Sequence, residues 1–289
     1  MRPVPPQFLL LGGIASVQFG AALASKLFAQ AGPGGVVLLR LALSALMLTL
    51  AVRPSLRGRT RSDLLAVLGY GLILGTMNWS FYEALSRLPI GVAVTIEFTG
   101  PLAVAIGGSR RAVDGVWVLC AGAGVVLLAV RGDSHDITAA GVVLALIAGA
   151  CWAGYILISQ RVGRTWAQVD GLALALCVGT LVVIPVGIVQ GGTALLRPSM
   201  LLGGAAVAIL SSILPYSLEL IALRRLAAAT FGLLMSLEPA VAAAAGVLVL
   251  GQPLHMITAV AIVLVVVASV GTTLTTRTAV PEPELVGPQ

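Results

Sequence analysis

Apolar runs about 20 residues long recur along the whole chain, and they limit its possible folds more than any other feature. Hydrophobic residues make up 58% of the sequence and charged residues only 10%, whereas soluble domains carry roughly 25% charged residues. A soluble fold of this composition would lack the polar side chains needed to cover its surface. The sequence therefore predicts an all-α protein that lies in a lipid bilayer.

Charged residues, proline and glycine divide the apolar sequence into ten predicted transmembrane helices. The expected spans are 8–27, 33–52, 63–86, 90–109, 113–130, 138–160, 168–188, 199–223, 226–248 and 255–276. Such spans leave only short loops and no separate soluble domain. The Pro- and Glu-rich tail at 278–289 is predicted to be a disordered cytoplasmic segment.

The basic residues predict the orientation of these spans. With the N-terminus in the cytoplasm, twelve of the 17 lysines and arginines fall on the inner side and four on the outer side, and Arg40 lies within a span. Both termini are therefore expected to be cytoplasmic. Short basic loops do not form the continuous surface of a nucleic-acid-binding protein, so no nucleic-acid partner is expected.

The two halves of the chain resemble each other at an offset of 138 residues. The stretch ALSRL at 84–88 matches ALRRL at 222–226, and Pro101 matches Pro239. Because each half holds an odd number of spans, the second half must enter the membrane upside down. The sequence predicts two inverted five-helix repeats, 1–134 and 135–277, which is a transporter architecture.

Small residues at steps of four form a ridge on the first span of each repeat. The ridge residues are Gly12, Ser16, Gly20 and Ala24 in one half, and Gly141, Ala145, Gly149 and Ala153 in the other. Ridges of this kind allow close packing between helices in lipid.

Ionisable side chains occur inside the predicted spans, where a charge costs roughly 2.5–3.5 kcal/mol near the membrane centre. Arg40 and Glu97 are expected at similar depth, either as an architectural ion pair or as groups that meet a charged substrate, and Glu97 is also a candidate proton carrier. Glu238 lies near the middle of the ninth span without an obvious basic partner. It is interpreted either as a proton carrier or as a neutral carboxyl group bonded to the backbone. Glu83 and Glu219 lie near span ends, where their side chains could reach water.

Prolines and further polar residues interrupt the same spans. The predicted helix breaks are Pro101, Pro215 and Pro239. Pro101 leaves the carbonyl group of Glu97 without its helical donor, which gives either a packing kink or a polar site for an ammonium group or a proton. The residues Asn78, Tyr82, Tyr155 and Tyr216 add hydrogen-bonding groups to the third, sixth and eighth spans.

The sequence lacks the signatures of a membrane enzyme. Its two histidines, His135 and His255, lie in or beside loops, and neither H-E-x-x-H nor G-x-S-x-G occurs. The three cysteines have no metal-ligand spacing, and no P-loop is present, so neither a metal, a cofactor nor bound ATP is expected. A membrane scaffold that transports nothing is an alternative, but it would have no need of midplane carboxylates.

Several stretches resemble the drug/metabolite transporter superfamily, specifically its EamA-type ten-helix exporters. They are 38–43, 75–118, 149–163 and 209–246, and the motifs EFTGP and MSLEPA are the most specific. The resemblance implies a bacterial inner-membrane exporter of small amino acids such as threonine or homoserine, exchanged for protons. At 250–253 the chain reads LGQP, whereas members of the wider family often carry an acidic residue after Leu-Gly.

These observations lead to the hypothesis of an alternating-access exporter whose partners are an amino acid, protons and the bilayer, acting as a monomer or homodimer. The expected substrate-binding residues are Arg40, Asn78, Tyr82, Glu97, Tyr155, Tyr216 and Glu238, with Glu97 and Glu238 coupling proton movement. An exporter of other metabolites or of cationic drugs on the same scaffold is the main alternative.

Overall fold

The structure, a computed structural model, describes residues 5–107, 112–131, 137–166, 169–215, 218, 231 and 234–277. Within these ranges the chain is helical and contains no strand. The helices are α1 (Pro6–Val52), α2 (Arg61–Leu85), α3 (Ile90–Glu97), α4 (Thr99–Gly107), α5 (Ala112–Arg131), α6 (Ala139–Thr165), α7 (Asp170–Gly191), α8 (Pro198–Ala208), α11 (Glu238–Leu250) and α12 (Met256–Arg277). A 3₁₀ turn, η1 (Gly192–Leu196), and a π-helical turn, η2 (Ile209–Ile213), precede and follow α8.

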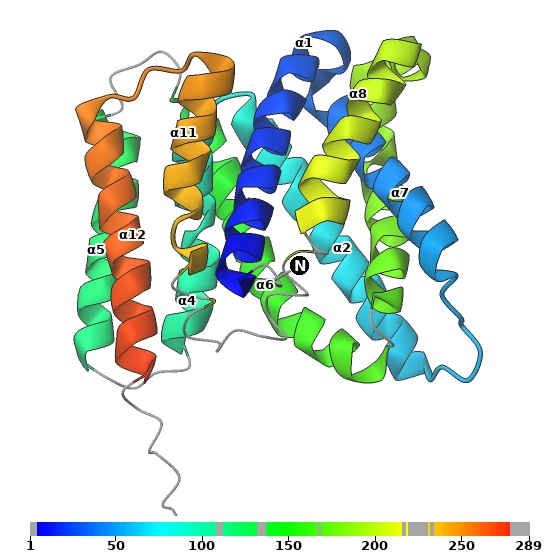
Figure 1. Cartoon of the computed structure of the whole chain (residues 1–289), viewed down its shortest axis with the longest axis horizontal. Coiled ribbons are helices and arrows are strands. Elements are labelled where there is room, and N and C mark those ends of the chain that lie inside the picture. Colours follow the sequence, from blue (N-terminus) through cyan, green and yellow to red (C-terminus); the bar gives the residue numbers. More distant parts are fainter. Residues whose placement is uncertain are drawn as a thin grey trace, which may run out of the picture.

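Helix α1 contains both of the first two predicted spans. Its 47 residues would extend about 70 Å as a straight helix, more than twice the roughly 30 Å of a bilayer core. Gly32 has φ 65° and ψ 164°, a conformation suited to glycine, and Pro33 follows it inside the helix. The chain therefore bends at this point, and Figure 1 shows α1 turning back at its upper end.

Two other predicted spans are interrupted where the sequence places proline. The predicted span 90–109 divides at Phe98 into α3 and α4, three residues before Pro101. In the predicted span 226–248, a turn at Ser236 and Leu237 precedes α11, and Pro239 lies in the first turn of that helix. Because proline lacks an N–H group, it is tolerated at a helix start and disturbs a helix interior.

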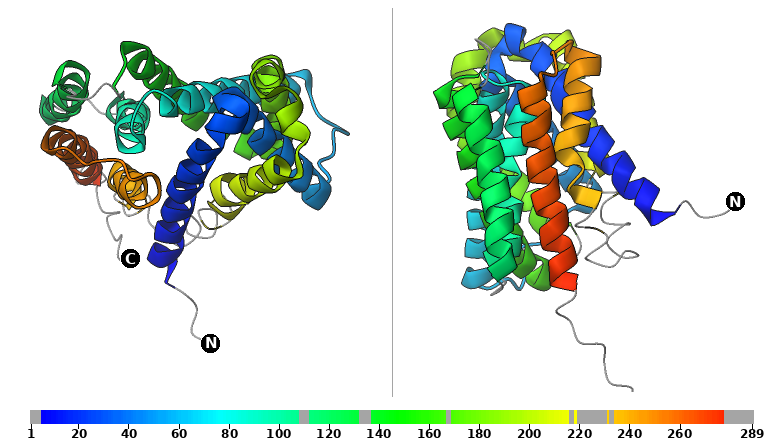
Figure 2. Two further views of the ribbon diagram at one scale, coloured as in Figure 1. Left: turned by 90° about the horizontal axis from the view of Figure 1, so that it is seen from above. Right: turned by 90° about the vertical axis from the view of Figure 1, so that its left-hand side faces the viewer.

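The helices pack side by side, with α2 against α6 and α7, α1 against α7 and α8, and α5 against α12 (Figure 2). Glycines allow the closest approach. A Cβ atom on Gly149 of α6 would lie 2.7 Å from the Glu97 carbonyl oxygen, and one on Gly100 would collide with the Gly149 carbonyl group. In the first half, Gly20 of α1 packs directly against Ser211. Both small-residue ridges thus contain residues that contact another helix closely.

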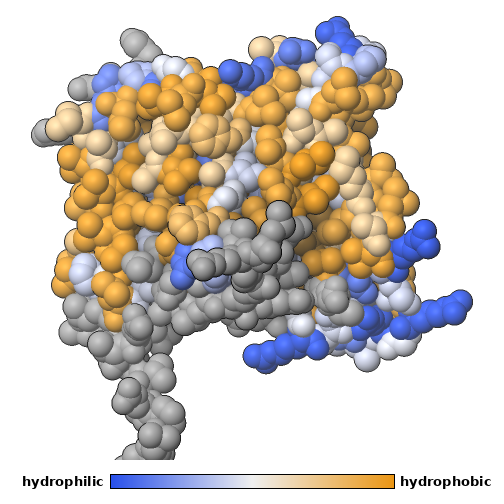
Figure 3. Space-filling model, viewed as in Figure 1, coloured by the Kyte–Doolittle hydropathy of each residue, from blue (hydrophilic) through white to orange (hydrophobic). Residues whose placement is uncertain are grey.

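The outer surface of the bundle is apolar. Large hydrophobic side chains such as Leu119, Leu202 and Leu248 are more than 70% exposed, and Figure 3 shows hydrophobic residues between polar groups at the upper and lower ends. Among the described residues, four helices are long and apolar enough to cross a membrane, α1 and α2 among them, and several shorter apolar helices accompany them. This surface suits contact with lipid.

Candidate functional site

Arg40 lies inside the helix bundle, where its side chain is 7% exposed. Its Nη1 donates to the Tyr82 hydroxyl group at 3.2 Å, its Nη2 to the Ser211 carbonyl oxygen at 2.8 Å and its Nε to the Ser212 hydroxyl group at 3.4 Å. The Tyr82 ring also contacts the guanidinium group, with 5.4 Å between the ring centroid and Cζ. Residues from α1, α2 and η2 therefore meet around one buried cation.

Pro215, which follows η2, explains why the Ser211 carbonyl oxygen can accept from Arg40. Pro215 has no N–H group, so the Ser211 carbonyl group, four residues earlier, lacks its usual helical donor. Arg40 supplies a donor in its place. Isolated π-helical turns often occur at functional sites because they disturb the regular hydrogen-bond pattern.

Arg40 keeps hydrogen-bonding capacity after these contacts. A guanidinium group carries five N–H donors, and residues in the described part of the chain accept three of them. Two buried hydroxyl groups, that of Ser44 on the same helix as Arg40 and that of Ser211 in η2, have no hydrogen-bond partner among the described residues. The arrangement can therefore bind a carboxylate group and further polar groups of a small molecule.

Glu97, the last residue of α3, is 8% exposed. Across the described residues, no atom of a basic side chain lies within 4.0 Å of its carboxylate oxygens, so the ion pair considered between Arg40 and Glu97 is absent. Arg40 binds Tyr82 and the η2 serines instead, although it still attracts the Glu97 carboxyl group electrostatically. A cation and a carboxyl group are thus buried in the same region without direct contact.

Glu238 occupies an equivalent kind of position in the second half. It is 4% exposed and is the first residue of α11, directly after the turn at 236–237. Both buried carboxyl groups therefore lie at helix interruptions, Glu97 just before one and Glu238 just after one.

The other expected site residues lie in different surroundings. Asn78 is buried, but its amide group donates to the Leu74 carbonyl oxygen of its own helix at 2.8 Å. Tyr155 packs its ring against Tyr70, with 5.2 Å between the centroids. Tyr216 and Glu219 lie outside the described residues.

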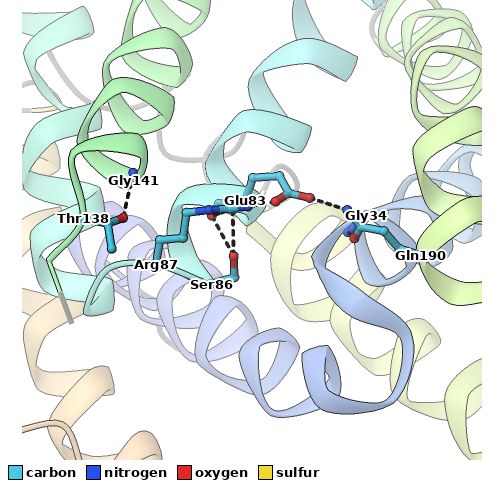
Figure 4. Close-up of polar contacts among 7 residues, drawn as sticks. All are labelled: Gly34, Glu83, Ser86, Arg87, Thr138, Gly141 and Gln190. Atoms are coloured by element: carbon cyan, nitrogen blue, oxygen red, sulfur yellow. Dashed lines mark hydrogen bonds and ion pairs between the residues drawn. The ribbon is translucent and has the colours of Figure 1, made fainter. Parts of the chain in front are cut away.

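Glu83 differs from the expectation that its side chain reaches water. The residue is 5% exposed, and its Oε2 pairs with Arg87 Nη1 at 2.6 Å, while its Oε1 accepts from Gln190 Nε2 at 2.7 Å. Gln190 Oε1 accepts in turn from the Gly34 N–H at 2.7 Å, just after the α1 bend (Figure 4). The carboxylate is fully bonded, which stabilises it away from water.

Sequence reasoning missed three residues that make buried polar contacts. They are Ser211 and Ser212, which accept from Arg40, and Gln190, which donates to Glu83. Two adjacent serines four and three residues before a proline, within an apolar run, were an available signal for a freed carbonyl group. Gln190 lies near the end of a span and carries no comparable signal. No group of acidic, histidine or cysteine side chains that could hold a metal occurs among the described residues.

Comparison with known proteins relates this chain to transporters. Residues 139–274 match the EamA-like transporter family. The chain is 46% identical to the threonine/homoserine exporter RhtA of Salmonella typhimurium (strain LT2) over 94% of this chain and 92% of that one. It is also 46% identical to RhtA of Escherichia coli (strain K12), over 96% and 95% of the two chains.

A solved structure, described only as a crystal structure of a protein, has the same fold. It matches with a TM-score of 0.62 at 20% sequence identity, over 94% of this chain and 99% of that chain. The relatives are named as exporters and not as enzymes. The chain therefore belongs to the EamA-like transporter family and is a multi-pass membrane transporter.

Proposed function

We propose that this protein exports threonine, homoserine and similar small amino acids across the bacterial cytoplasmic membrane by alternating access, in exchange for protons. The observation that carries the proposal is the buried Arg40, two of whose N–H groups have no acceptor among the described residues after its contacts with Tyr82, Ser211 and Ser212. The names of the exporters at 46% identity support the substrate class.

A zwitterionic amino acid complements the charges around Arg40. Its carboxylate group would accept the two remaining guanidinium N–H bonds, because charge-assisted bonds of arginine are among the strongest in proteins. Its ammonium group would face the Glu97 carboxyl group, which has no ion-pair partner in the described part of the chain. The side-chain hydroxyl group of threonine or homoserine would bond to the Ser211 or Tyr82 hydroxyl group.

Cationic drugs suit this site less well. Arg40 is a permanent positive charge that acts electrostatically on Glu97, so a cation without a carboxylate group would meet repulsion. This favours an amino-acid exporter over the cationic-drug alternative.

The proposed architecture is ten helices in two inverted repeats. The interruptions at Phe98 and Ser236 support it, because they are 138 residues apart, the same offset that relates Pro101 to Pro239. The bend at Gly32 supports two spans within α1. In such transporters the substrate site lies near the membrane midplane, next to interrupted helices.

Proton coupling is proposed for Glu97 and Glu238. Both carboxyl groups are buried beside helix interruptions, and alternating access would change their contact with water. Inward movement of one proton supplies about 2.3 kcal/mol per 100 mV of membrane potential. Exchange of one proton for one zwitterion would therefore drive export.

The test is transport by the purified full chain in proteoliposomes. Labelled threonine is measured in counterflow and in efflux, with and without a pH gradient, and glutamate serves as a control substrate of higher charge. Threonine counterflow together with faster efflux under the gradient is expected. Absence of threonine and homoserine counterflow, with transport of lipophilic cations instead, would contradict the substrate assignment.

A further inference from the structure

A cavity of about 340 Å³ opens at the end of α2 that is opposite its arginine-rich end. We call it the outer pocket and define it by four of its lining residues: Arg87, Thr138, Gln252 and His255. These residues come from three separate segments of the chain, the α2–α3 turn, the start of α6 and the segment between α11 and α12. The pocket is distinct from the region around Arg40, and none of the contacts of Arg40 lines it.

Arg87 lines this pocket and carries two side-chain donors that no described residue uses. Its side-chain bonds to the described residues all leave from Nη1, which lies 2.6 Å from Glu83 Oε2, 2.6 Å from the Glu83 carbonyl oxygen and 3.0 Å from the Ser86 hydroxyl group. In the described residues, Nε and Nη2 have no hydrogen-bond partner, and the side chain is 38% exposed. The Nε and Nη2 donors of arginine match the two oxygens of a carboxylate group.

Contacts with Glu83 fix the position of the Arg87 side chain. Glu83 holds Nη1, and both Glu83 oxygens are occupied, one by Arg87 and the other by Gln190. Gln190 is itself bonded to Gly34, beside the α1 bend (Figure 4). A guanidinium group held in one orientation loses less conformational entropy on binding a ligand.

The remaining lining groups favour an anion. Gln252 Oε1 accepts from the Ile90 N–H at 3.0 Å, which leaves the Gln252 amide nitrogen as a donor. The His255 imidazole ring adds a nitrogen group that can donate a hydrogen bond. Helices α3, α6 and α12 begin directly after pocket residues Pro89, Thr138 and His255, whereas α2 ends at Leu85 and α11 ends two residues before Gln252. Three positive and two negative ends of helix dipoles therefore lie near the cavity.

We propose that the outer pocket binds the carboxylate group of the exported amino acid on the outer side of the membrane, through Nε and Nη2 of Arg87. This inference rests on the proposed function, which supplies both the identity of the substrate and the side of the membrane that the pocket faces. The pocket is then a second site, separate from the one around Arg40, through which external amino acid opposes further export.

The experiment measures efflux of labelled threonine from proteoliposomes that hold the full chain, as a function of unlabelled external threonine. Each variant is compared with its own rate into threonine-free medium. In Arg87→Gln, the external concentration that halves efflux should rise about tenfold or more. Arg197→Gln removes another positive charge from an exposed helix start outside the pocket, and it should match the wild type.

Arg87→Gln leaves the buried Glu83 without its cation and can therefore misfold. A second variant tests the pocket without removing this ion pair. Gln252→Glu keeps the Arg87–Glu83 pair and can still accept from Ile90, but it places a negative charge in the pocket. It should raise the halving concentration in the same direction. Equal halving concentrations in the wild type, Gln252→Glu and Arg197→Gln would overturn the outer-pocket inference and leave the exporter proposal intact. Absence of threonine efflux from wild-type vesicles would overturn both.

Discussion

Arg40 Nη2 lies 2.8 Å from the Ser211 carbonyl oxygen, which Pro215 deprives of its helical donor. The contact joins α1 in the first half of the chain to η2 in the second half. It also orients a buried cation, two of whose N–H groups have no acceptor in the part of the chain that the structure describes. The interruption of one helix and the position of the arginine on another are therefore parts of the same arrangement.

Replacement of Arg40 is predicted to abolish most export. Arg40→Gln removes the charge and the charge-assisted bonds to a substrate carboxylate, each worth about 1.5–3 kcal/mol, so threonine counterflow should fall about 10- to 100-fold or more. Arg40→Lys keeps the charge but cannot reach three separate acceptors and should recover only part of the activity. Tyr82→Phe removes one acceptor and keeps the ring, so its effect should be smaller than that of Arg40→Gln. Equal activity of Arg40→Gln and the wild type would exclude Arg40 as a substrate ligand.

Replacement of Glu97 is predicted to separate coupling from exchange. Glu97→Gln has the same shape and cannot take part in proton transfer, so the acceleration of efflux by a pH gradient should disappear. Counterflow requires no net proton movement and should persist at a reduced rate, because the amide group binds an ammonium group less strongly. Efflux from vesicles with and without the gradient measures the difference. If the pH gradient accelerates efflux by Glu97→Gln as much as efflux by the wild type, Glu97 does not couple proton movement. Glu238→Gln is then the next variant to test.

The contact of Gly149 with the Glu97 backbone is predicted to tolerate no side chain. In Gly149→Ala, a Cβ atom would lie 2.7 Å from the Glu97 carbonyl oxygen, and overpacking of this kind costs about 1–3 kcal/mol. The thermal unfolding temperature of the detergent-purified protein should therefore fall, and counterflow should fall with it. Gly122→Ala is the matched control, since nothing lies within 4 Å of its Cβ position. A larger loss of stability in Gly122→Ala than in Gly149→Ala would contradict the packing described here.

Gln190 is predicted to require an amide group. Gln190→Glu places a second carboxylate against Glu83 and removes the N–H donor at 2.7 Å, so the unfolding temperature should decrease. The double variant Glu83→Gln with Gln190→Glu restores an amide–carboxylate pair in the reverse direction and should recover part of the loss. If the double variant is as unstable as the sum of the two single variants, the two side chains are not coupled.

The general fold could be predicted from sequence because long apolar runs have few possible structures in lipid. The helix interruptions near Pro101 and Pro239 follow from the missing proline N–H groups in the same way. The sequence predicted a boundary between two spans near Gly32. The structure instead has a bend there, with helix on both sides of Gly32.

The site was predicted less completely. Arg40 and Tyr82 were both expected there, and the structure places their side chains in contact. Similar depth also suggested an Arg40–Glu97 pair, but depth does not determine which face of a helix a side chain occupies. The contacts of Ser211 and Gln190 depend on how distant helices pack against each other, and one sequence holds no record of that packing.

The amide group of Gln190 bonds at both ends, accepting from Gly34 and donating to Glu83. The two contacts cannot be exchanged, because the Gly34 N–H group only donates and the Glu83 carboxylate only accepts. The bend of α1 and the orientation of Arg87 are therefore linked through the placement of one nitrogen and one oxygen atom on α7. A change from amide to acid at this single position keeps the acceptor that faces Gly34 and replaces the donor that faces Glu83 with a second acceptor.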